Sequence, residues 1–189
     1  MKVLGDSKLP KFIDDILPSM GVSVKSMESL DDLASVTEAD GLPGMIYLET
    51  PANPTLQIHS IKAAADWAKN NSSEDHRIIV AVDNTFLGPI VQRPLELGAD
   101  LNVYSATKYI GGHSDLIAGA VSGEATAMAK VFEYRTFFGG MADPYTSWML
   151  SRSMETLQVR VARQIRSTRL ILDHIQEAPG TPVSGITKI

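Results

Sequence analysis

Short apolar runs separated by polar segments predict buried β-strands in the middle of the chain. Residues 45–48, 78–82 and 101–104 are each dominated by apolar side chains, and 78–82 is β-branched and apolar on both faces. Runs of this kind are typical of strands that are covered on both sides. We expect further strands at 22–24 and 116–121.

Between these runs, apolar residues recur every three or four positions, which predicts helices. A short helix is expected over 10–20, with Gly21 as its stop signal. Ser29 followed by Asp32 is a capping-box pattern that predicts the start of a second helix. The other expected elements are a helix with Ile58, Ile61, Ala65 and Ala68 on one face, a loop over 70–76, a helical turn over 95–99 closed at Gly98, and helical spacing at Leu150, Met154, Leu157, Val161 and Ile165.

Apolar strands that alternate with helices predict an α/β fold with a mainly parallel sheet flanked by helices. In such sheets, ligands bind beyond the carboxyl ends of the strands. Three of the expected strands are followed by polar residues at that end: Glu49 and Asn53, then Asp83, then Ser105, Thr107 and Lys108. We therefore expect a functional site at this edge, and an irregular tail over 178–189.

Composition and charge narrow the class of protein. The 189 residues are 44% hydrophobic and 21% charged, with a formal net charge of -5, so a packed core is expected and nucleic acid or an anionic membrane is not favoured as a partner. There is no cysteine, which excludes disulfides and thiolate catalysis. The first residues carry no signal-peptide pattern, so a cytoplasmic protein is the expectation.

The strand-end residues suit the chemistry of an aldehyde cofactor, pyridoxal 5′-phosphate. An amine that forms a Schiff base must be partly neutral, and we expect burial beside a strand to desolvate Lys108. Asp83 is the candidate acid for the ring nitrogen, and Ser105 and Thr107 are candidate phosphate donors. Asn53 is placed to donate to the phenolic oxygen. From the residues alone, an exposed lysine, a turn and a helix cap remain open as alternatives.

Four segments carry a resemblance to a known enzyme family. They are residues 49–55 (ETPANPT), 82–86 (VDNTF), 92–100 (QRPLELGAD) and 105–115 (SATKYIGGHSD). The last of these is similar to the signature around the Schiff-base lysine of the Cys/Met-metabolism pyridoxal-phosphate enzymes. That family includes cystathionine γ-synthase, cystathionine γ-lyase, cystathionine β-lyase and methionine γ-lyase. The resemblance covers most of the chain.

The resemblance implies a role for each site residue. Lys108 would bind the cofactor and carry protons between substrate carbons, and Asp83 would pair with the pyridinium nitrogen. Ser105 and Thr107 would contact the phosphate, and Asn53 would lie near the phenolic oxygen with Glu49 behind it. The implied fold is the aspartate-aminotransferase-like, fold type I large domain. We expect residues 1–177 to form part of it, with 178–189 where a small C-terminal domain would begin.

The chain departs from the family in its missing parts. Members are longer, and an upstream phosphate-binding segment and the C-terminal arginine that clamps a substrate carboxylate have no counterpart in the 189 residues. A fragment, a truncated gene model and a degenerate paralogue are the alternatives. Each predicts exposed apolar surface where other parts would pack, and a homo-oligomer, a dimer or tetramer, is expected of the full-length form.

These features leave several functions open. The leading one is γ-elimination or γ-replacement on methionine, cystathionine or activated homoserine, with an amino acid as the small-molecule substrate. The alternatives are a cystathionine β-lyase and a non-catalytic remnant that joins an intact relative. A metal hydrolase is disfavoured because the histidines are scattered, and we expect His113 to satisfy backbone near the lysine loop. The histidines are His59, His76, His113 and His174.

Overall fold

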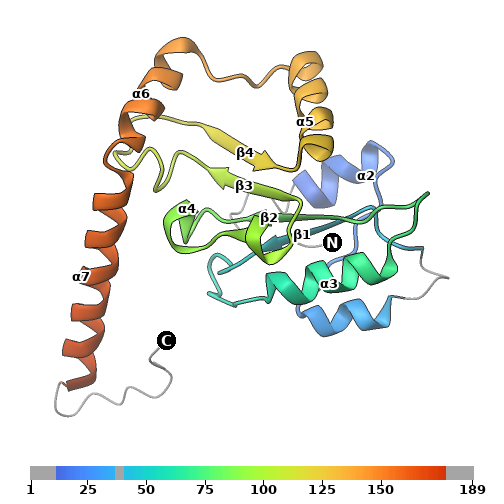
Figure 1. Ribbon diagram of the computed structural model, residues 1–189, viewed down its shortest axis with the longest axis horizontal. Coiled ribbons are helices and arrows are strands. Elements are labelled where there is room, and N and C mark those ends of the chain that lie inside the picture. The colour runs from blue at the N-terminus through green and yellow to red at the C-terminus, as the bar shows by residue number, and fades with distance from the viewer. Residues whose placement is uncertain (1–11, 37–40, 178–189) are drawn as a thin grey trace.

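The computed structural model describes residues 12–36 and 41–177 (Figure 1). Its strands are β1 (Met45–Glu49), β2 (Ile79–Asp83), β3 (Leu101–Ser105) and β4 (Gly119–Gly123). Its helices are η1 (Phe12–Ile16), α2 (Leu17–Ser19), η2 (Leu30–Ser35), α3 (Ile61–Asn71), α4 (Gly88–Val91), η4 (Pro94–Leu97), α5 (Ala125–Phe138), α6 (Pro144–Met154) and α7 (Leu157–Glu177). The expected tail over 178–189 lies outside the described residues.

The strands form one four-stranded sheet in the order β1-β2-β3-β4. Strands β1, β2 and β3 run parallel, with Glu49 opposite Asp83 and Asp83 opposite Val103. Strand β4 pairs antiparallel to β3. The prediction of a mainly parallel α/β sheet is confirmed, and the carboxyl ends of the three parallel strands meet at one edge.

The main core lies between the sheet and α3. Alternate side chains of β1 and β2 point to this face, because successive residues of a strand face opposite sides. Figure 1 shows α3 running alongside β1 and β2. Complete burial of one valine, leucine or isoleucine side chain in this core stabilises the fold by about 2 kcal/mol. The buried cluster consists of Leu33, Ile46, Leu48, Ile61, Ala64, Ala68, Ile78, Val80, Val82 and Ala99.

Helix α3 begins later than the pattern predicts. The hydroxyl of Ser60 accepts a hydrogen bond from Ala63 N at 3.2 Å and caps the helix, so Ile61 is its first residue. Ile58 precedes this cap and is 68% exposed, so its assignment to the helix face was wrong. The helix also runs to Asn71, into the expected loop.

The N-terminal predictions had mixed outcomes. Within the expected helix over 10–20, the described residues form η1 and α2, and Gly21 follows with φ of 79°. The capping box of Ser29 and Asp32 is confirmed at the start of η2. The expected strand at 22–24 is wrong. Those residues instead line a cavity of about 730 Å³ that the edge strand β1 also lines, and they belong to no strand of the described sheet.

The C-terminal helical pattern is interrupted once. Two helices, α6 and α7, replace the continuous spacing from Leu150 to Ile165, and the break falls at Glu155 and Thr156. Helix α6 begins at an N-cap, where Asp143 accepts hydrogen bonds from the N–H groups of Tyr145 and Thr146. Strand β4 also begins later than expected, at Gly119, and Val121 in it is 36% exposed.

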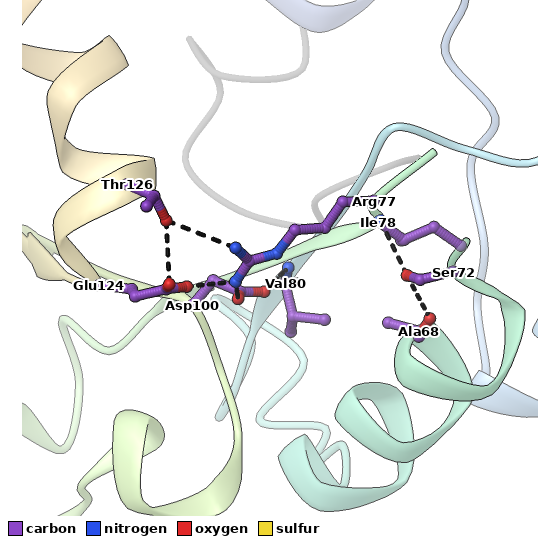
Figure 2. A network of polar contacts seen from close by, with 8 residues as sticks. All are labelled: Ala68, Ser72, Arg77, Ile78, Val80, Asp100, Glu124 and Thr126. Atoms are coloured by element: carbon purple, nitrogen blue, oxygen red, sulfur yellow. Dashed lines mark hydrogen bonds and ion pairs between the residues drawn. The ribbon is translucent and has the colours of Figure 1, made fainter. Parts of the chain in front are cut away.

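A polar network joins the strands at the edge opposite the expected site (Figure 2). Arg77, which lies before β2, donates to Asp100 at 2.6 Å and also pairs with Glu124 after β4. Asp100 in turn accepts a hydrogen bond from Val80 N at 2.8 Å. Hydrogen bonds to Glu124 and then to Asp100 raise the pKa of the Arg77 guanidinium, and the bond from Arg77 lowers the pKa of the Glu124 carboxyl. The network ties β2, β3 and β4 together at their far ends.

Ser72 completes this edge on the α3 side. Its hydroxyl donates to Ala68 O at 2.7 Å and accepts from Ile78 N at 3.0 Å (Figure 2). The end of α3 is thereby joined to the start of β2. Within the described residues, no helix is long and apolar enough to cross a membrane.

Candidate functional site

Asp83 is held at the carboxyl end of β2 by three hydrogen bonds. Its Oδ1 accepts from Thr85 N at 3.0 Å and from Thr85 Oγ1 at 2.6 Å. Its Oδ2 accepts from the hydroxyl of Tyr47 at 3.3 Å. A carboxylate has about four acceptor sites, so these bonds leave one on Oδ2 for a further donor.

Tyr47 approaches Asp83 from the neighbouring strand. It lies two residues before Glu49 on β1, and the register places both on the sheet face of Asp83. Burial raises the pKa of the Tyr47 phenol above its ordinary value of 10.0, and the Asp83 carboxylate raises it further by charge and by hydrogen bonding. The phenol therefore remains a donor to Asp83 at neutral pH.

Thr85 connects the ends of β2 and β3. While its hydroxyl donates to Asp83, the same oxygen accepts from the backbone N–H of Ser105 at 2.7 Å. One side chain thus fixes the carboxylate and the start of the lysine turn relative to each other. Ser105 is half-buried and lies two residues beyond Val103, on the same sheet face as Asp83.

A buried amide network supports this edge from the other face. Asn84 is fully buried, and its Nδ2 donates to Gly88 O at 3.2 Å and to Gln92 O at 2.9 Å. Gln92 Nε2 donates to Asn84 Oδ1 and to Thr50 O, both at 2.9 Å. The residues after β1 and after β2 are therefore held together through α4 and the turn that follows it.

Lys108 lies in a tight turn directly after β3. Its backbone N–H donates to Ser105 O at 3.0 Å, and its carbonyl accepts from Gly112 N at 2.7 Å. The residue is exposed in the described part of the chain, so the expectation that the strand alone would desolvate it was wrong. Lys108 is exposed because it lies beyond the end of β3, where the helices that cover the sheet no longer shield it.

Thr107 forms hydrogen bonds with Ala118, the residue directly before β4. Its hydroxyl donates to Ala118 O at 3.2 Å and accepts from Ala118 N at 2.9 Å. Its own N–H also donates to Ala118 O, at 3.1 Å. For Thr107 to donate to a phosphate, one of these donors has to leave the carbonyl.

The remaining predicted residues lie along the same edge. Glu49 ends β1 opposite Asp83 and is half-buried. Asn53 lies in the loop after β1, where Ala52 N donates to Gln57 O at 2.9 Å and closes a turn. His113 Nδ1 lies 2.7 Å from Gly111 O, which confirms the expected backbone role. No group of potential metal ligands occurs among the residues that the structure describes.

Some residues of the site were missed by sequence reasoning. Tyr47 was detectable, because the period of two along β1 places it on the face of Glu49. Asn84 and Thr85 fall in the segment 82–86 that carries the family resemblance, but no role was expected for either. Arg160 of α7, which bonds the turn after Lys108, carried no local signal because it lies 51 residues away from Tyr109.

Comparison with known proteins defines the family. A sequence profile described as Cys/Met metabolism PLP-dependent enzyme matches residues 7–184. The chain belongs to this family. Its members use pyridoxal 5′-phosphate, and those similar to this chain are named γ-lyases, γ-synthases and β-lyases.

Individual relatives differ in name but agree in extent. The chain is 39% identical to an L-methionine gamma-lyase of Porphyromonas gingivalis over 71% of this chain and 33% of that protein. It is 31% identical to a cystathionine beta-lyase of Bacillus subtilis over 89% and 42%. A crystal structure of cystathionine gamma-lyase from Lactobacillus plantarum, complexed with L-serine, matches with a TM-score of 0.77 and 33% identity over 93% and 47%. The chain thus spans less than half the length of these relatives.

The family's cofactor fits the residues present at the edge. Asp83 is fixed by three donors and retains an acceptor site on Oδ2, which suits the N–H of a pyridinium ring. Lys108 is the amine in the turn after the adjacent strand. The fold agrees as well, because the sheet and its helices match part of the fold type I structures of the family.

Proposed function

We propose that this chain supplies the lysine-bearing part of an enzyme that performs γ-elimination or γ-replacement on methionine, cystathionine or activated homoserine. One relationship carries the proposal. Asp83 ends β2 and Lys108 follows β3, the adjacent parallel strand, so an acid and an amine share one sheet edge. In this proposal, residues 1–177 form part of the large domain, and a small domain would begin within 178–189.

Each residue has an assigned part in holding the cofactor. Lys108 would bind its aldehyde, and Asp83 would accept a hydrogen bond from the ring nitrogen. Ser105 and Thr107 are the proposed phosphate contacts, of which Ser105 has its N–H committed to Thr85 and its hydroxyl available to donate. Asn53 and Glu49 are assigned to the side of the phenolic oxygen.

The chain's own groups then have defined chemical tasks. When bound, pyridoxal phosphate withdraws electrons from the substrate carbon next to the amine. Asp83, which Thr85 and Tyr47 hold in place by hydrogen bonds, would keep the ring nitrogen protonated. The amine of Lys108 accepts a proton from one substrate carbon and returns it to another. Loss of a group from Cγ gives elimination, and its exchange for a nucleophile gives replacement.

Cystathionine distinguishes the reaction types in one assay. Elimination at Cγ releases cysteine, 2-oxobutanoate and ammonia, whereas elimination at Cβ releases homocysteine, pyruvate and ammonia. We expect 2-oxobutanoate from the chain loaded with pyridoxal phosphate, and no product from Lys108→Arg. Pyruvate would instead support the β-lyase alternative. That alternative is retained because one similar protein, from Bacillus subtilis, is named a cystathionine beta-lyase. If neither acid forms from cystathionine, and neither methionine nor activated homoserine with a thiol is converted, although Lys108 binds cofactor, the result supports the non-catalytic alternative.

We also propose that the chain acts in an oligomer. Several large apolar side chains of α5 and α6 are exposed, including Phe137 at 76%, Phe138 at 77% and Trp148 at 57%. This agrees with the expectation of exposed apolar surface, and patches of this kind mark interaction sites. Light scattering after size-exclusion chromatography tests the proposal, which a monomer at every concentration would contradict.

A further inference from the structure

Arg160 of α7 bonds the turn after the lysine through the two terminal nitrogens of its guanidinium. Its Nη1 donates to Tyr109 O at 2.8 Å, and its Nη2 donates to Ile110 O at 3.0 Å. Tyr109 and Ile110 are the two residues that follow Lys108. Hydrogen bonds from a charged donor are among the stronger ones in proteins.

The same side chain also bonds the break between α6 and α7. Nη2 donates to Ser153 O at 2.8 Å, and Nε donates to Thr156 Oγ1 at 3.0 Å. Arg160 is half-buried there, on the first turns of α7. The turn after β3 is therefore attached to the helix junction through one residue.

The turn has little else to fix these two carbonyls. Its other backbone bonds run from Lys108 N to Ser105 O at 3.0 Å, and from Gly111 N to Ala106 O and Gly112 N to Lys108 O, each at 2.7 Å. They close the turn but use neither the Tyr109 nor the Ile110 carbonyl. Arg160 therefore determines how the turn is oriented toward α7.

Gly112 gives independent evidence of how closely Arg160 approaches the turn. Its φ of 72° favours glycine, and a Cβ at this position would lie 1.9 Å from Arg160 Nη1. No side chain fits between the turn and the guanidinium. The sequence thus provides a residue without a side chain where Arg160 approaches the backbone.

We propose that Arg160 is a positioning residue that sets the orientation of Lys108 through the carbonyls of Tyr109 and Ile110. It does not touch the cofactor or the substrate in this account. The inference rests on the proposed function, because it is the covalent reaction of Lys108 with the cofactor that the orientation serves.

The first measurement needs no cofactor. Amide hydrogen exchange is followed over residues 109–112 in the full 189-residue chain, in Arg160→Ala and in Arg160→Lys. Arg163→Ala is the matched control, because Arg163 is exposed on the same helix and bonds only Ser167 among the described residues. Exchange at the hydrogen-bonded amides of Gly111 and Gly112 should accelerate about tenfold or more in Arg160→Ala, since the turn loses its two hydrogen bonds to the charged guanidinium. Equal exchange in Arg160→Ala and Arg163→Ala would overturn the proposal.

The second measurement separates orientation from general stability. Each folded variant is mixed with pyridoxal phosphate, reduced with borohydride, and digested for mass spectrometry. We expect the labelling rate of Lys108 to fall in Arg160→Ala and to recover partly in Arg160→Lys, while labelling of the exposed Lys62 and Lys130 stays constant. A merely structural role would change all lysines together or none, and either result would overturn the proposal.

The two measurements also separate this proposal from the function on which it rests. If Lys108 of the wild-type chain is not labelled, the proposed function fails and the positioning role fails with it. If Lys108 is labelled equally in wild type and Arg160→Ala, only the positioning role fails.

Discussion

The hydroxyl of Thr85 lies 2.6 Å from Oδ1 of Asp83 and donates a hydrogen bond to it. The same oxygen accepts from Ser105 N, so Thr85→Val removes two hydrogen bonds and leaves a part-buried N–H without its partner. We expect the free energy of unfolding to fall by about 1–3 kcal/mol. Chemical denaturation measures this.

Thr85→Ser is the control for that change. It keeps the hydroxyl and loses only a methyl group, so it should retain most of the stability. If serine and valine destabilise the chain equally, the hydroxyl is not what links Asp83 to Ser105.

We expect the partly buried Tyr47 phenol to make the free energy of unfolding fall at high pH. Its pKa is raised above 10.0 in the folded chain, chiefly by burial and then by Asp83. The unfolded chain therefore releases this proton first as pH rises. The stabilisation is fully present below about pH 10 and is lost above it, by up to about 1.4 kcal/mol per pH unit.

Tyr47→Phe removes this titrating group. Urea unfolding at a series of alkaline pH values should give a shallower decline of the unfolding free energy for the phenylalanine variant than for wild type. Parallel declines would show that Tyr47 ionises equally in both states, against the buried contact with Asp83.

Within the polar network of Arg77, Asp100 and Glu124, we expect substitution of Asp100 to lower the free energy of unfolding most. Its Oδ2 accepts from Val80 N at 2.8 Å and its Oδ1 binds Arg77, so Asp100→Ala leaves the N–H of a central strand unsatisfied. We expect a loss of about 1–3 kcal/mol in unfolding free energy. Glu124→Gln is the contrasting variant, because Glu124 is exposed and screened by solvent, and its effect should be much smaller. A larger effect for Glu124→Gln would reverse this ranking.

The strands were predictable because each buried strand is a local run of apolar residues in the sequence. Strands β1, β2 and β3 each fall within one residue of the predicted ends. The segment 22–24 has similar residues but faces a cavity instead of a neighbouring strand. Strand pairing depends on what lies beside a segment, and the segment's own residues do not contain that information.

The helix break and the site were predictable only in part. The apolar spacing continues through Glu155 and Thr156, so the pattern did not reveal where α6 ends. Polar residues at strand ends correctly indicated a shared sheet edge, because parallel strands align their carboxyl ends. Their hydrogen-bond partners were not predictable, since Arg160 reaches the lysine turn from a distant helix.

The covalent reaction of Lys108 tests the central claim most directly. The chain is incubated with pyridoxal phosphate, reduced with borohydride, and the modified lysine is located by mass spectrometry, with Lys108→Arg as the charge-preserving control. The account predicts that Lys108 is labelled well ahead of Lys62 and Lys130, that Lys108→Arg loses this label, and that Asp83→Asn weakens cofactor binding. Labelling of Lys108 no faster than that of the exposed lysines would contradict it.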